Sequence, residues 1–201
     1  MTRLAALLVA ALLGSAGAGK AQPTAQDWPC VQRKVPTIAA GAIWAGPDPA
    51  AAADWGRDAA AAALAQKLAA RRTALDEADQ LIDAFAAAAG SEREQRLTRV
   101  FAGVLELINL ERSRVIEAIE RYARGQRRLA DRVRDESDRL SAVKDSPGAQ
   151  GPADDRALET EFFWDKRIFE ERSQALPYVC EAPVILEQRL FELARKLQQR
   201  L

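Results

Sequence analysis

The chain has 201 residues, with 29 basic and 29 acidic side chains, no histidine, two cysteines and a single methionine, the initiator Met1. Without histidine, the protein lacks imidazole-activated nucleophiles, histidine-ligated metals or haem, and histidine-based pH switches. The balanced charge gives no electrostatic footprint for DNA, RNA or anionic lipid, so we expect no nucleic-acid partner.

The first 21 residues have the three parts of a secretory signal peptide. Arg3 precedes an apolar run, Leu4–Leu13, and small residues then offer cleavage after Ala18 or after Ala21, of which we favour Ala21. The run is only about half as long as the ~20 residues that a spanning helix needs. We therefore predict a cleaved signal peptide over residues 1–21 and no integral membrane segment after cleavage; an uncleaved, membrane-anchored N-terminus is the alternative.

Export also determines how the two cysteines are interpreted. The high alanine and arginine content is typical of a GC-rich bacterium, so we expect a periplasmic or secreted protein. In an oxidising compartment, Cys30 and Cys180 are most simply paired in one disulfide. Two free thiols or an intermolecular bridge are the alternatives.

Residues 22–54 form a predicted arm that is rich in proline and tryptophan. Its prolines exclude a long helix: they are Pro23, Pro29, Pro36, Pro47 and Pro49. The candidates for burial are Val31, Val35, Ile38 and Ile43. Because tryptophans are concentrated here, we expect the arm to lie along a helical body; an aromatic arm that inserts into a partner is the alternative.

Residues 55–201 have helical periodicity. The first block runs from Trp55, after a possible N-cap at Asp54, to Ala89, with a possible break near Arg72. Gly90 and Ser91 mark a stop and a new start. The second block runs from Glu92 to about Lys144, and its heptad seam predicts Ala118 among the inward residues.

The remaining chain predicts a loop and two further helices. The loop covers residues 145–152, and a helix follows from about Asp154 to Gln174. Pro177 is expected to end that helix, residues 178–180 to form a turn, and Pro183 to begin the last helix.

These blocks predict an all-α fold of elongated antiparallel helical hairpins, with coiled-coil-like seams, an irregular N-terminal arm and one disulfide. If the first helix runs antiparallel to the second, both cysteines lie near the middle of the long helix. A compact four- or five-helix bundle, with the long helix broken at Gly125, is the alternative that the sequence leaves open.

No catalytic motif, cofactor site or metal site stands out, so we predict a non-catalytic interaction, scaffold or accessory protein of the bacterial envelope. Its partner would be another envelope protein or a second copy. The second hypothesis is a periplasmic small-molecule-binding or sensory bundle, with aromatic residues around a mid-body pocket and charged residues that orient a ligand. An enzyme ranks third. The candidate interaction or pocket residues are Trp28, Trp44, Glu111, Arg112, Arg121, Tyr122, Trp164 and Tyr178. We expect Glu111 to form a half-buried pair with an arginine.

Overall fold

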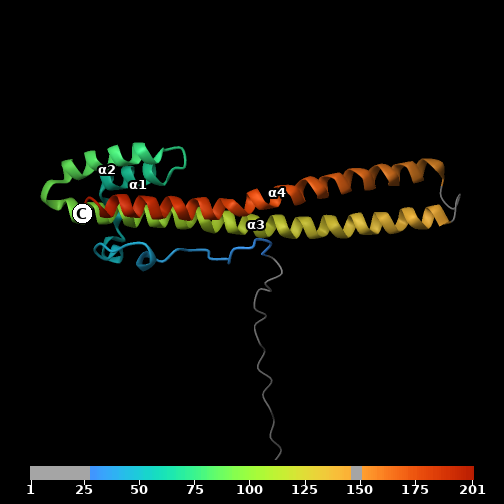
Figure 1. The fold of residues 1–201 in the computed structure, drawn as a ribbon, viewed down its shortest axis with the longest axis horizontal. Helices are drawn as coiled ribbons and strands as arrows, with labels where there is room; N and C mark the ends of the chain where they lie inside the picture. The colour runs from blue at the N-terminus through green and yellow to red at the C-terminus, as the bar shows by residue number, and fades with distance from the viewer. Residues whose placement is uncertain (1–27, 146–150) are drawn as a thin grey trace, which may run out of the picture.

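The computed structural model describes residues 28–145 and 151–201, and within these ranges the protein is an elongated helical molecule without strands (Figure 1). The predicted signal peptide and the first residues of the arm lie outside the described ranges. The described part of the arm contains two short 3-10 helices, η2 (Ala40–Ala42) and η3 (Pro49–Ala52), and a third, η4 (Trp55–Arg57), follows the arm. The helical body then consists of α1 (Ala59–Ala69), α2 (Leu75–Ala89), the short η5 (Gly90–Glu92), α3 (Arg93–Asp145) and α4 (Pro152–Gln198).

The two longest helices, α3 and α4, lie antiparallel along the length of the molecule (Figure 1). α3 has 53 residues, which at 1.5 Å per residue gives a length of about 80 Å. It is continuous through Gly125, so the compact alternative with a break at that residue is wrong. Among the described residues, nothing lies within 4 Å of the place that a Cβ atom would take at Gly125. The predicted seam of α3 is wrong at Ala118, which is exposed, whereas Ile116 and Ile119 on either side are buried.

The first predicted helix is instead two shorter helices, α1 and α2. The N-cap of α1 is Asp58, whose carboxylate accepts from the amides of Ala60 and Ala61, whereas Asp54 makes no capping hydrogen bond. The break expected near Arg72 is confirmed. At the turn, Thr73 is buried and its hydroxyl donates to the carbonyl of Lys67 at 2.7 Å. The chain therefore folds back at residues 70–74 and does not continue down α3.

Gly90 ends α2 as the sequence predicts. Its φ is +54°, a conformation that strains residues with a Cβ atom, and nothing crowds the space where a Cβ atom would lie. Backbone conformation, and not packing, therefore requires glycine at the first residue of η5, directly after α2.

The helix expected to end before Pro177 does not end there. α4 runs from Pro152 to Gln198 with both Pro177 and Pro183 inside it, so the predicted turn at residues 178–180 is wrong. Each proline removes one intrahelical hydrogen bond and favours a bend. α4 does change direction in this region (Figure 1). Contacts with the arm and with α3, described below, hold the backbone together here.

The main hydrophobic core occupies one end of the molecule. It contains residues of the arm, of α1 and of α2, but residues of α3 only as far as Ile108 and of α4 only from Leu186 onward. Trp44 of the arm stacks on Phe101 at 4.0 Å between ring centroids. Close packing here requires Gly103, because a Cβ atom at that position would approach Ala65 and the Trp55 ring to 2.8 Å. We call residues 117–145 of α3 together with residues 152–180 of α4 the stalk, because these two helices pack there without α1 or α2.

The arm lies along the helical body, as expected. Ile38 is buried and Ile43 is partly buried against the core, so these two predictions are confirmed. The predictions for Val31 and Val35 are wrong, since both are exposed. Asn109 of α3 fixes the arm by accepting from the Ile38 amide at 2.8 Å and donating to its carbonyl at 3.0 Å.

Candidate functional site

A disulfide joins the arm to α4. Cys30 and Cys180 are bonded, with their Cα atoms 5.6 Å apart, so the predicted pairing is confirmed. Nearby, Lys34 pairs with Glu120, which lies close to the middle of α3. The disulfide therefore lies near the middle of α3, as expected. The reason differs from the predicted one, because α1 and α2 do not form a single helix that runs antiparallel to α3.

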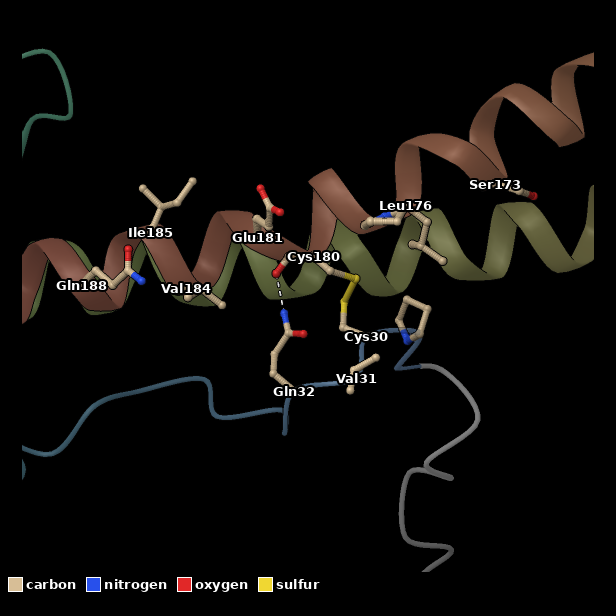
Figure 2. Close-up of a pocket in the computed structure, with 12 residues that line it drawn as sticks. Cys30, Val31, Gln32, Ser173, Leu176, Cys180, Glu181, Val184, Ile185 and Gln188 are labelled. Carbon is tan, nitrogen blue, oxygen red and sulfur yellow. Dashed lines mark hydrogen bonds between the residues drawn. A yellow bond between two sulfur atoms is a disulfide. The ribbon is translucent and has the colours of Figure 1, made fainter.

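An open groove of about 630 Å³ lies beside this disulfide, between the arm and α4 (Figure 2). Its apolar wall comes from Val31 of the arm and from Leu176, Pro177, Val184 and Ile185 of α4. Glu181 and Gln188 add polar groups along the α4 side, and the side chain of Gln32 donates to the carbonyl of Cys180. The groove is thus a mainly apolar surface with a few polar groups at its edge.

A buried arginine connects the arm, α3 and α4 at the same level. Arg112 is 4% exposed, and its Nε donates to the Val35 carbonyl at 2.9 Å. Another nitrogen donates to the carbonyl of Pro183, and a third lies 3.1 Å from the Glu187 carboxylate. Because a buried charge is stable only when it is paired and hydrogen-bonded, this arrangement fixes the three segments relative to one another.

The stalk has polar groups where a coiled coil would have apolar ones. Arg132 of α3 pairs with Asp165 of α4, and Glu136 is buried beside them at 3% exposure. Burial, followed by repulsion from Asp165, raises the pKa of Glu136 above its usual value, and the opposing effect of Arg132 is smaller. One oxygen of Glu136 lacks a hydrogen-bond partner among the described residues. The stalk interface is therefore less stable than an apolar seam of the same length.

The structure brings together only some of the candidate residues. Trp28 and Arg112 line one small cavity of about 240 Å³. Glu111 is exposed and lies beside a different pocket, so the expected half-buried pair involving Glu111 is wrong: the next residue, Arg112, takes the buried position and pairs with Glu187.

The other candidates lie far from a common pocket. Trp44 is buried in the core, and Tyr122 donates from its hydroxyl to the Arg172 carbonyl across the stalk. Arg121 is exposed beside Glu117. Trp164 and Tyr178 are also exposed, at 53% and 75%. The aromatic residues therefore do not surround a single mid-body pocket.

A row of apolar side chains along α4 points away from α3. Its members are spaced by three and four residues, with one charged position, Glu171, among them, and we call this row the outer stripe. It consists of Trp164, Ile168, Glu171, Ala175, Tyr178, Ala182 and Ile185. Four of its members are large and exposed: Trp164, Ile168, Tyr178 and Ile185. The signal was present in the sequence as a second heptad pattern, but the turn predicted at residues 178–180 concealed it.

Comparisons with family models, curated proteins and solved structures find no match to this chain. Across the described residues, no helix combines the length and apolarity needed to cross a bilayer. The same residues contain no group of three or more carboxylates or cysteines placed to hold a metal ion.

Proposed function

We propose that this protein is a non-catalytic interaction or scaffold protein of the bacterial envelope, exported to the periplasm by its N-terminal signal peptide. The observation that carries the proposal is the stalk, which extends beyond the core and bears large exposed apolar side chains on α4. Phe163 is 64% exposed and lies next to Trp164, with which it makes an edge-to-face contact at 6.3 Å. Contiguous apolar groups of this kind on a protein surface are typical of interaction sites.

The stalk is suited to presenting such a surface. Two helices without a surrounding core expose most of their circumference, so a partner can approach from several sides. The ion pair of Arg132 with Asp165 and the hydrogen bond from Tyr122 to the Arg172 carbonyl join α3 and α4 outside the main core. The apolar groups are thereby placed well away from the folded end of the molecule.

Photo-crosslinking in the native host tests the interaction function. A photoreactive amino acid replaces Phe163, and a matched variant carries it at Asp138, an exposed residue of α3 on the same stalk. We expect specific adducts heavier than the chain from position 163 and only background from position 138. Equal adduct patterns at the two positions would contradict the proposal.

The export part of the proposal has its own test. Processing after Ala21 leaves a mature chain that begins at Gln22, and the mass of the protein purified from the native host measures this directly. The formation of the Cys30–Cys180 disulfide supports an oxidising compartment. A protein that retains Met1 in the host would refute cleavage.

A second candidate function is small-molecule binding in the groove beside the disulfide. Its volume of about 630 Å³ lies within the range of about 300–1,000 Å³ typical of ligand sites, and its wall is mainly apolar. A panel of apolar small molecules would then raise the melting temperature of the wild-type protein but not that of Val184→Trp, which fills the groove. A uniform lack of stabilisation across the panel would count against this function.

A further inference from the structure

The outer stripe continues a face of α4 that the protein already covers within the core. There, Arg189 donates to the carbonyls of Leu68 and Thr73 at the turn between α1 and α2, and Lys196 pairs with Asp79 of α2. Arg189 lies four residues after Ile185, and Lys196 lies seven residues after Arg189, so both belong to the same face of α4. α2 covers this face in the core, and from Ile185 toward the stalk it is uncovered and apolar.

The uncovered stripe needs a helical occupant of matching length. From Trp164 to Ile185 it spans 22 residues, or about 33 Å of helix. After removal of the proposed signal peptide the chain supplies none itself, because the other residues outside the described ranges, 22–27 and 146–150, contain no large apolar side chain. Spacing by three and four residues is the pattern by which one helix packs along another.

We propose that the occupant is the outer stripe of a second copy, packed antiparallel around a two-fold axis near Gln174; this inference rests on the interaction function proposed above. In this register each exposed aromatic side chain of the stripe faces an aliphatic one. Trp164 faces Ala182 of the second copy, and Ile168 faces its Tyr178. Glu171 faces Ala175 of the second copy, so its carboxylate meets no charge of the same sign across the interface. A two-fold pairing repeats each of these contacts, so Trp164, Ile168 and Tyr178 each gain an apolar partner, whereas Ile185 lies beyond the paired stretch, opposite Glu161.

The flanking charges fit the same register. Residues one position before Ile168 and Ala182 lie beside the seam, and they are Arg167 and Glu181. In the antiparallel pairing, Arg167 of each copy meets Glu181 of the other, while Gln174 meets its own counterpart at the axis. Arg167 already lies 2.9 Å from Glu171 in its own helix, so it also neutralises the one charged position of the stripe.

One contact opposes the pairing. Arg172 lies on the other flank and meets Arg172 of the second copy across the axis. Because like charges at an interface are unfavourable, Arg172→Gln is expected to tighten the dimer, whereas it would leave an unrelated mode of association unchanged. Within the described part of the chain, the contact across the stalk at this position is the hydrogen bond from Tyr122 to the backbone carbonyl of Arg172, which the substitution leaves in place.

Sedimentation equilibrium of the purified mature protein at concentrations up to about 500 µM tests this inference. We expect a monomer–dimer equilibrium that Arg167→Glu weakens about tenfold, because glutamate then faces Glu181 twice. The double variant Arg167→Glu with Glu181→Arg restores the opposite charges across the interface but leaves Glu171 without its arginine, so it is expected to dimerise at least about threefold more tightly than Arg167→Glu without reaching the wild-type affinity. Circular dichroism confirms that each variant, changed only at exposed residues, retains its helix content.

The outcomes separate this inference from the proposed function. A dimer whose charge-swap variant recovers affinity relative to Arg167→Glu supports the antiparallel pairing. A dimer that Arg167→Glu does not weaken overturns this surface as the interface. A strictly monomeric protein overturns self-association, yet the interaction function stands if position 163 still crosslinks to another envelope protein, and falls if it crosslinks to nothing above background.

Discussion

Removal of the disulfide tests how the arm and the helical body depend on each other. The double variant Cys30→Ser with Cys180→Ser opens a covalent loop of 150 residues. In the chain-entropy model, closing a loop of this length stabilises the folded state by about 5 kcal/mol, because the bridge restricts the unfolded chain. For a chain of this size, that loss corresponds to a decrease in melting temperature of about 10–20 °C.

The native contacts of the arm decide whether that magnitude applies. Asn109 holds Ile38, and Arg112 holds Val35, so the arm is expected to remain docked from about Lys34 onward without the bridge. The effect should therefore come almost wholly from the unfolded state. The folded variant should keep its helix content.

Urea denaturation followed by circular dichroism measures the free energy of unfolding for the wild type and for the double serine variant. Reducing agent provides the control, since it should destabilise the wild type to the level of the variant and leave the variant unchanged. A difference below about 1 kcal/mol, with cooperative unfolding and equal slopes, would refute the reasoning, because the reduced unfolded chain would then be no freer than the bridged one.

Three further predictions concern buried or paired charges. Arg112→Met removes the donors to the carbonyls of Val35 and Pro183, and we expect a loss of about 3–5 kcal/mol in urea denaturation; a loss no larger than that of an exposed arginine variant such as Arg134→Met would argue against its bridging role. Because the pKa of Glu136 is raised, the folded state favours its neutral form, so Glu136→Gln should raise the melting temperature at pH 7 and have little effect below pH 4; destabilisation at pH 7 would contradict this. The hydrogen bond from Arg96 lowers the pKa of Asp58 from 3.8 to about 2, so this carboxylate contributes roughly 2 kcal/mol above pH 4 and loses that contribution as the pH falls toward 2. Asp58→Asn should therefore flatten the acid limb of a stability–pH curve, and an unchanged limb would rule out this assignment.

The sequence of α3 alone could not predict which of its polar residues is buried beside the arm. The sequence predicted that Glu111 is half-buried, but the structure exposes Glu111 and buries the next residue of α3, Arg112. The Arg112 side chain donates hydrogen bonds to carbonyls of the arm and of α4, two segments that are distant in the sequence. No local pattern in α3 could report those partners.

The candidate site shows the same division. The row from Trp164 to Ile185 is visible in the sequence only if α4 is known to be continuous, and two prolines argued locally against continuity. Proline disfavours a helix interior because it loses a hydrogen bond and its ring clashes with the preceding turn. The disulfide at Cys180 and the Arg112 contact to Pro183 stabilise these turns from outside the helix.

Local chemistry was enough to determine the all-helical class and the stop at Gly90, because periodicity and backbone preferences act over a few neighbouring residues, whereas it left open whether the 53-residue helix continues through Gly125. It also favoured the disulfide, since the chain has only two cysteines, and the structure confirms that pairing. Tertiary packing alone decided that α1 and α2 fold back on one end, that α4 passes through both prolines, and that one face of α4 is left uncovered. These outcomes depend on contacts between distant segments, whose energies outweigh the preferences of any single residue.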